Sequence, residues 1–178
     1  MFIPRILGKT FEEVNMTAVA LVFVGITLIL NGYLMWNKKE TKPLIVFNLF
    51  TGGMIILFNI YVIMSGGNLV GAFGGLLFGL TNLLVAFDLI FKESPWATGN
   101  FSLLATVCAI AICAFNFVDG ELLKGVMWAL WSLIWLFAFI GFSLKKQFQP
   151  ATFAMFIVQG FLTTGTFGLL QLFDIVKF

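Results

Sequence analysis

Histidine is absent from the 178 residues of the chain. Its absence removes the commonest general base, the usual neutral-pH sensor and the commonest metal ligand. The sequence also contains no Ser-His-Asp set, no phosphate loop and no HExxH motif, each of which would indicate a specific chemistry. We therefore expect neither an enzyme nor a bound metal or cofactor.

Charged residues are scarce, at 10% of the chain, whereas soluble proteins carry about 25%. Hydrophobic residues make up 61%, and the mean hydropathy is +1.06. Such a chain cannot cover a surface that faces water, so membrane lipid is its expected surrounding. The net charge of +2 is too small to indicate a nucleic-acid partner.

Only two cysteines are present, Cys108 and Cys113, in one apolar segment. At about 100° per residue they point to different sides of a helix. Neither a local disulfide nor a metal pair is predicted, and both thiols are expected to be buried and unreactive.

Long stretches without any charged residue dominate the sequence. They cover residues 17–37, 43–87, 94–118, 125–144 and 147–173. A spanning helix needs about 20 apolar residues, so four stretches fit one helix each and the second fits two, divided by Ser65-Gly66-Gly67-Asn68. The sequence therefore predicts an all-α integral membrane protein. Its six transmembrane helices are expected near 17–36, 43–64, 69–91, 99–118, 125–144 and 151–173.

The chain repeats itself about every 54 residues. Prolines 43, 95 and 150 each open an even-numbered helix, and the segments 23–28 and 77–82 share a Gly-x-Thr. We interpret the repeat as three successive helix hairpins, each an odd-numbered helix followed by an even-numbered one, in a twisted bundle. Such repeats often place a permeation path at their shared axis, so a pore within each protomer is expected. Short loops alone would give a similar spacing, and the shared Gly-x-Thr favours the repeat.

Lysines indicate the orientation in the membrane. The connections after the odd-numbered helices hold Lys38, Lys39, Lys42, Lys92, Lys145 and Lys146, and the opposite side holds Arg5, Lys9, Lys124 and Lys177. Positive residues favour the cytoplasmic side, so both termini are predicted to lie outside.

Residues 1–15 differ from the rest because they are mixed in charge. Glu12-Glu13-Val14 can be encoded by codons that contain a ribosome-binding sequence just before the Met16 codon. We hypothesise that 1–15 is a translated leader and that the native protein is the six-helix domain 16–178. The alternative is an interfacial amphipathic helix. N-terminal sequencing of natively expressed protein distinguishes the two.

The fifth predicted helix carries Trp128, Trp131 and Trp135 on one face. They extend about 10 Å along the axis, which is too deep for one interfacial belt. The rings could form a flat slot in a pore wall, with indole N–H groups that donate to a carbonyl oxygen. Alternatively, they pack against neighbouring helices, and the residues alone leave both interpretations open.

Neutral amides within the predicted helices are a second candidate feature. Asn31 follows Leu21, Val24 and Leu28 at three, four, three spacing, Asn82 follows Phe78 by one turn, and Gln159 precedes Gly160. In lipid such groups face protein or water. Each alone is explained by an interhelical hydrogen bond, whereas together they would supply a path with donors and acceptors and no charge.

Small and charged residues complete the candidates. Gly71, Gly75 and Gly79 form a stripe that favours close helix packing over a flexible hinge. Asp88 and Lys92 are predicted to form an i, i+4 ion pair. An ion- or proton-coupled carrier that uses Asp88, or a membrane subunit without transport, are the alternatives to a channel. Ion pathways ordinarily need buried carboxylates or charged rings, which are nearly absent here.

From about Met16 to Phe173 the sequence resembles the urea/amide channel family (AmiS/UreI), which includes acid-activated urea channels. The matching stretches are 23–32, 48–53, 75–81, 131–135 with Ala138-Phe139, and Gln159-Gly160. The resemblance implies a passive channel for urea or short-chain aliphatic amides. It also implies a homo-hexamer in a bacterial cytoplasmic (inner) membrane, with a pore through each protomer.

The resemblance also implies roles for particular residues. The outer constriction would contain Leu21, Val24, Leu28 and Trp135, and the inner one Phe78, Trp128 and Trp131, with Ile134 nearby. The family's acid-gated channels carry Glu where this chain has Gln159, Tyr where it has Asn82, and histidines in long outer loops. The replacements and the missing histidines predict permeation without histidine-based acid gating.

Overall fold

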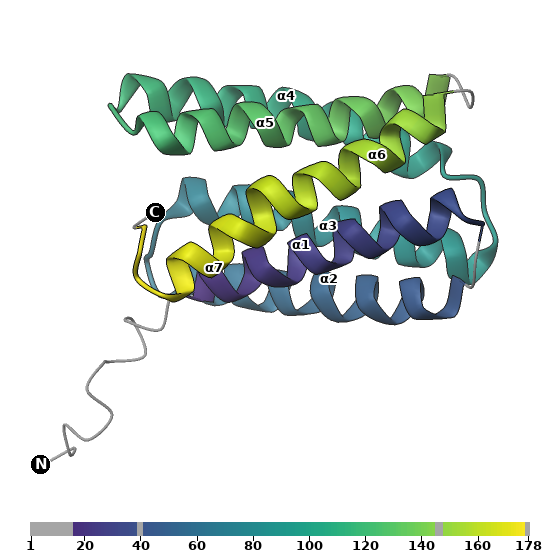
Figure 1. Cartoon of the computed structure of the whole chain (residues 1–178). Helices are drawn as coiled ribbons and strands as arrows, with labels where there is room; N and C mark the ends of the chain where they lie inside the picture. The colour runs from purple at the N-terminus through teal and green to yellow at the C-terminus, as the bar shows by residue number, and fades with distance from the viewer. Residues whose placement is uncertain (1–15, 39–40, 145–147, 177–178) are drawn as a thin grey trace, which may run out of the picture.

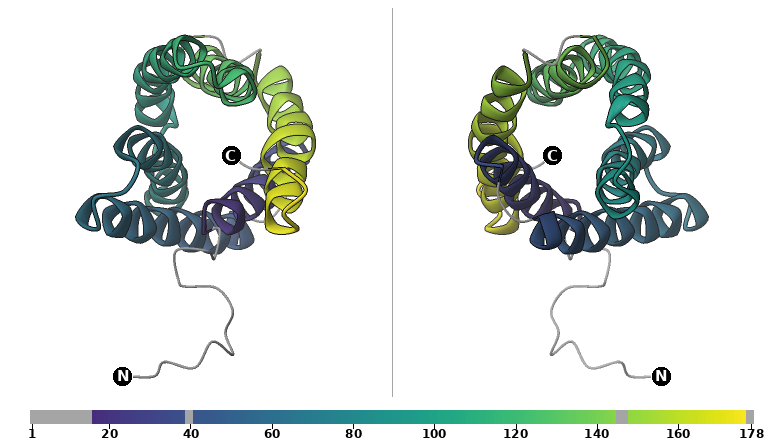
Figure 2. Two further views of the ribbon diagram at one scale, coloured as in Figure 1. Left: turned by 90° about the vertical axis from the view of Figure 1, so that its left-hand side faces the viewer. Right: turned by 90° about the vertical axis from the view of Figure 1, so that its right-hand side faces the viewer.

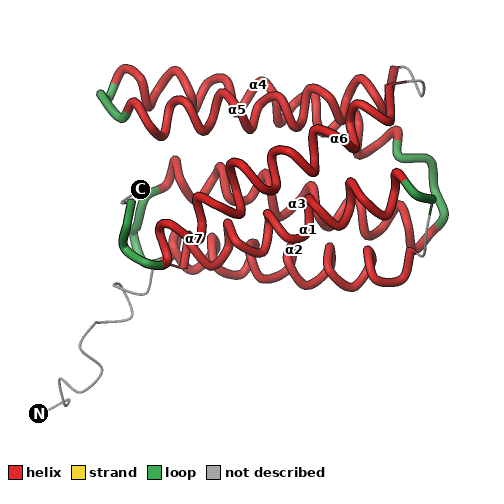
Figure 3. The backbone as a smooth tube through the Cα atoms, viewed as in Figure 1, coloured by secondary structure: helices red, strands yellow, loops and turns green. Residues whose placement is uncertain are grey.

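The computed structural model describes residues 16–38, 41–144 and 148–176 (Figure 1). Residues 1–15, to which the leader hypothesis refers, lie outside the described residues. Throughout the described ranges the secondary structure is helical, and six helices are long and apolar enough to cross a membrane (Figure 3). This confirms the predicted all-α membrane architecture.

The helices follow one another with short connections. They are α1 (Met16–Trp36), α2 (Thr41–Met64), α3 (Leu69–Phe91), α4 (Trp96–Val118) and α5 (Leu122–Phe139), which continues as a π-helical segment over Ile140–Leu144. The last spanning helix consists of α6 (Gln149–Gln159), a π-helical segment (Gly160–Gly165) and α7 (Thr166–Leu172). The two π-helical segments are not predicted by the sequence pattern.

Local sequence explains where the helices begin. Pro95 directly precedes α4 and Pro150 lies in the first turn of α6, where a missing backbone N–H costs nothing. Asn68 caps α3, since its side-chain oxygen accepts from the backbone N–H of Gly71 at 3.0 Å. Gly66, with φ of 75°, forms the turn that separates α2 from α3.

The six spanning helices surround a common axis (Figure 2). The most extensive packing joins α2 to α3, α4 to α5, and α1 to the last helix, which closes the ring. The predicted hairpins of α1 with α2, α3 with α4 and α5 with α6 are in contact as well, but over smaller surfaces. The start of α1 and the end of α7 lie at the same end of the bundle (Figure 1).

Glycines explain why α1 packs so closely against the last helix. A Cβ atom at Gly25 would lie 2.5 Å from the Cα atom of Gly165 and 2.9 Å from the carbonyl oxygen of Gly160. A Cβ atom at Gly168 would lie 2.7 Å from the backbone nitrogen of Val22. The two backbones therefore touch directly, as in small-xxx-small helix pairs.

The three glycines of the α3 stripe have different neighbours. A Cβ atom at Gly79 would lie 2.7 Å from Ile56 of α2, and one at Gly75 would lie 2.3 Å from the amide nitrogen of Asn59. The three atoms nearest to a Cβ atom at Gly71 would instead belong to the side chain of Asn68, the first of them at 3.1 Å.

Candidate functional site

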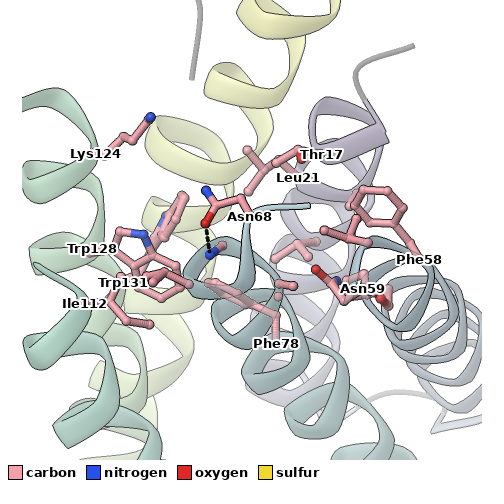
Figure 4. Close-up of a pocket in the computed structure, with 18 of the residues that line it drawn as sticks. Thr17, Leu21, Phe58, Asn59, Asn68, Phe78, Ile112, Lys124, Trp128 and Trp131 are labelled. Atoms are coloured by element: carbon pink, nitrogen blue, oxygen red, sulfur yellow. Dashed lines mark hydrogen bonds between the residues drawn. The ribbon is translucent and has the colours of Figure 1, made fainter. Parts of the chain in front are cut away.

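A cavity of about 170 Å³ lies inside the ring and is lined by α1, α2, α3, α4 and α5 (Figure 4). Thr17, Asn68 and Lys124 line it near the helix ends. These ends adjoin the connections 65–68 and 119–121, at the same end of the bundle as the start of α1. The cavity therefore opens toward that end and extends inward between the helices.

The rings of Phe78, Trp128 and Trp131 form the inner boundary of the cavity, and Trp135 lies beside Phe78 outside its lining. The ring of Phe78 lies 4.5 Å from Trp135, 5.4 Å from Trp131 and 6.2 Å from Trp128, measured between centroids. Trp128 and Trp131 meet edge to face at 5.1 Å. All four side chains are buried, and we call them the aromatic cluster. The structure thus brings together residues that the resemblance divides between two constrictions.

The structure gives the order of the tryptophans relative to the open end of the cavity. Because α5 begins at the open end of the cavity, Trp128 lies nearest that end and Trp135 lies farthest from it. Leu21 and Val24 of α1 line the cavity together with Phe78, Trp128 and Trp131. Trp128 therefore lies closer to the open end of the cavity than Trp135, and the assignment of the two constrictions to the outer and inner sides stays a prediction.

Threonine hydroxyls occupy two of the three indole N–H groups that the sequence suggested for a solute. The indole nitrogen of Trp131 donates to Oγ1 of Thr163 at 3.1 Å, and that of Trp135 donates to Oγ1 of Thr81 at 2.8 Å. A buried indole N–H without a partner would cost about 1–3 kcal/mol, so these contacts fix both rings. Trp131 and Trp135 therefore present ring surfaces and not their N–H groups.

Gln159 lies behind the aromatic cluster and does not line the cavity. Its amide nitrogen donates to the carbonyl oxygen of Leu130 at 3.3 Å. The hydroxyl of Thr163 lies 3.0 Å from its amide oxygen and 2.7 Å from its backbone carbonyl oxygen. Through Thr163, Gln159 supports the position of Trp131.

Asn31 and Asn82 are also engaged within the protein. Asn31 and Asn48 exchange two amide hydrogen bonds, of 3.0 and 2.6 Å, and Thr27 meets Thr51 at 2.8 Å in the same interface of α1 with α2. Asn82 donates to the carbonyl oxygen of Phe78 at 2.8 Å. Neither Asn31 nor Asn82 lines the cavity, and Leu28 and Ile134 lie outside its lining too.

The cavity contains polar residues that the sequence analysis did not select. Asn59 of α2, Asn116 of α4, Asn68 and Lys124 contribute its polar surface. Lys124 lies 3.4 Å from Glu121 in an i, i+3 ion pair. Asn59 and Asn116 carried the same signal as Asn31, a neutral amide inside an apolar span, and the same reasoning would have found them.

Asp88 lies toward the other end of α3 and does not line the cavity. Its carboxylate accepts a hydrogen bond of 2.5 Å from the hydroxyl of Thr98. Within the described residues Asp88 forms no ion pair with Lys92. The predicted pair fails because Lys92 caps the helix with a left-handed backbone, φ 57°, which ends the i, i+4 geometry.

A ring of spanning helices around an internal, largely apolar cavity is the architecture of a membrane transport protein. The chain belongs to the AmiS/UreI family of transporters, because the profile of that family matches residues 16–175. It is accordingly a multi-pass helical membrane protein.

Relatives and solved structures agree with this assignment. The acid-activated urea channel of Helicobacter pylori is 29% identical over 181 residues, which cover 83% of this chain and 93% of that protein. A Mycolicibacterium smegmatis protein described as a transporter of amidate substrates is 27% identical over 154 residues, 83% of this chain and 72% of that one. The crystal structure of the H. pylori urea channel superposes with a TM-score of 0.80 at 27% identity and covers 91% of this chain and all of that one. A cryo-electron microscopy structure of that channel in its closed state gives 0.81 at 26% identity, with 90% and 99% covered.

Proposed function

We propose that this protein is a passive channel for urea or short-chain aliphatic amides. The observation that carries the proposal is the cavity that ends at the aromatic cluster. Ring faces suit a planar, neutral solute, which exchanges water for dispersion contacts as it enters. The urea channel and the amidate transporter among the relatives support the same class of solute.

The charges of the cavity favour a neutral solute over an ion. Lys124 is the one charged residue in its described lining, and it lies near Glu121 at the open end. The inner boundary consists of aromatic rings that cannot replace the hydration shell of an ion. We propose a bacterial cytoplasmic membrane as the location, with both termini outside and a homo-hexamer as the assembly.

Stopped-flow uptake into proteoliposomes tests the function. Urea, acetamide and formamide should equilibrate faster than in empty liposomes, without accumulation above the outside concentration, while a potassium salt should be excluded. An uncoupler should have no effect, because no coupling ion is involved. Uptake at the rate of empty liposomes would refute the channel, and uphill accumulation that an uncoupler abolishes would show a carrier.

We also expect urea uptake to stay nearly constant between neutral pH and about pH 5, because the chain has no histidine to titrate in this range. Gln159 cannot titrate either. Uptake into proteoliposomes at matched internal and external pH measures this. A steep rise toward the acidic end would show that other groups gate the path.

A further inference from the structure

We propose that the cavity is a solute-binding vestibule in which Asn59 and Asn116 accept hydrogen bonds from the N–H groups of an amide before it reaches the aromatic cluster. This inference rests on the proposed function and names the residues that would recognise the solute. Three observations support it: the free hydrogen-bonding capacity of the two asparagine oxygens, the burial of both side chains, and the glycines of α3 beside the cavity.

The side-chain oxygen of Asn59 can accept a hydrogen bond, whereas its amide nitrogen already donates one within the protein. Its amide nitrogen donates to the carbonyl oxygen of Ile55, one turn earlier on α2, at 2.8 Å. Only 5% of the residue is exposed, and no donor among the described residues reaches its side-chain oxygen. The intrahelical bond fixes the amide, so the oxygen is the group left for a ligand.

Asn116 repeats this arrangement on α4. Its amide nitrogen donates to the carbonyl oxygen of Ile112 at 2.7 Å, and the residue is 7% exposed. Asn59 and Ile112 lie on opposite sides of the cavity (Figure 4), and Asn116 follows Ile112 by one helical turn. Asn59 and Asn116 thus line the cavity from different helices, each with its amide nitrogen held by an intrahelical hydrogen bond.

Both oxygens retain accessible surface. Among the described residues, the fully buried side-chain polar atoms that lack a partner belong to Gln171 alone. The oxygens of Asn59 and Asn116 therefore touch open space, and both residues line the cavity. A water needs roughly 10–15 Å³ of such space, so about 170 Å³ admits a small solute with part of its hydration.

Two adjacent glycines of α3 make room for this arrangement. A Cβ atom at Gly75 would lie 2.3 Å from the amide nitrogen of Asn59, and one at Gly74 would lie 2.2 Å from the ring of Trp128. Without side chains at these positions, an amide from one side and an indole from the other approach the same stretch of backbone. The vestibule therefore combines fixed acceptors with an aromatic surface.

This chemistry selects a small planar molecule that is rich in N–H donors. Its N–H groups would replace water at the Asn59 and Asn116 oxygens, and its flat face would lie on Phe78 or Trp128. Asn68 supplies a complementary donor near the open end, since Gly71 occupies its oxygen and its amide nitrogen points away from that bond (Figure 4). Urea and primary amides carry both kinds of group.

The test compares solutes with and without N–H groups. Asn59→Leu and Asn116→Leu keep the side-chain size and remove the acceptor. Uptake of urea relative to N,N-dimethylformamide, a planar amide without N–H, is measured below saturation in proteoliposomes. One neutral hydrogen bond corresponds to about a five-fold change, so each variant should lower this ratio about five-fold.

Asn100→Leu is the matched control. Asn100 also donates to a carbonyl oxygen one turn earlier, that of Trp96, at 2.8 Å, but it lies outside the cavity. Its variant should keep the wild-type ratio. An unchanged ratio in both cavity variants, or an equal loss for both solutes, would overturn the vestibule while the channel itself stands.

A binding measurement separates this inference from the channel function. Acetamide titrated into detergent-solubilised protein should change the fluorescence of the cavity tryptophans in a saturable way. Each leucine variant should weaken the apparent affinity about five-fold. Absence of saturable binding to a folded wild type would overturn the vestibule, whatever the liposomes show.

Discussion

Gly25→Ala should strongly destabilise the protein, by about 3 kcal/mol or more, because the added methyl group meets the backbone of the last helix. Its Cβ atom would lie 2.5 Å from Gly165 and 2.9 Å from the Gly160 carbonyl oxygen. Backbone cannot rotate away as a side chain can, so the last helix must separate from α1. Thermal unfolding in detergent micelles measures the loss.

Gly53→Ala provides the control for this prediction. It is the same change in a neighbouring spanning helix, but nothing lies within 4 Å of the added Cβ atom. Alanine is favoured over glycine in a helix by roughly 0.5–1 kcal/mol, so this variant should unfold no earlier than wild type. Equal unfolding of the Gly25 and Gly53 variants would contradict the close contact of α1 with the last helix.

Replacing Trp131 and Trp135 together by alanine should change the solute selectivity of uptake about ten-fold or more, since one methylene in an apolar pocket already discriminates by about that factor. The double variant opens the aromatic cluster beside Phe78, whose ring lies 5.4 and 4.5 Å from the two indoles. Larger amides should then enter faster relative to urea. Stopped-flow uptake of urea and butyramide measures the ratio.

Phe142→Ala with Phe156→Ala is the matched double variant. These two rings are also buried, 8% and 5% exposed, and pack edge to face at 6.2 Å, but they do not line the cavity. Each change of a large aromatic residue to alanine costs about 3–5 kcal/mol, so both double variants lose stability. Only the tryptophan variant should alter selectivity. Unchanged selectivity in a folded variant that lacks Trp131 and Trp135 would argue against an aromatic path.

The sequence predicts the helices well because lipid imposes a simple rule. A segment that crosses the bilayer must satisfy its own backbone and exclude charge, so runs without charge mark the spans within a few residues. Turn residues at 65–68 and the prolines at the starts of α4 and α6 mark the ends. These signals are local and need no knowledge of the neighbouring helices.

The direction in which each side chain points is harder to predict. In a soluble protein, polar residues reveal the outer face of a helix, but here the lipid face and the packed face are both apolar. Asn31 and Asn59 are therefore equivalent in the sequence, although the first binds Asn48 and the second lines the cavity. Whether such an amide binds another side chain or lines the cavity depends on the residue opposite it, which lies on another helix.

The π-helical segment at 160–165 was also beyond the sequence pattern. It lies where Gly160 and Gly165 meet Gly25, and Thr163 within it receives the indole hydrogen bond of Trp131. A widened turn of this kind responds to tertiary contacts, and such turns occur frequently at functional sites. The residues were visible in the sequence, whereas the change in helical phase was not.

The contact between the first and the last helix also determines when the protein can become complete during synthesis. The pairs α2–α3 and α4–α5 join neighbours in the chain and can form as soon as each pair has entered the membrane. The glycine face of α1 meets its partner only after α6 and α7 have left the ribosome. Until then this face and the interior of the bundle remain open to lipid. Insertion of the last helix covers both and completes the ring.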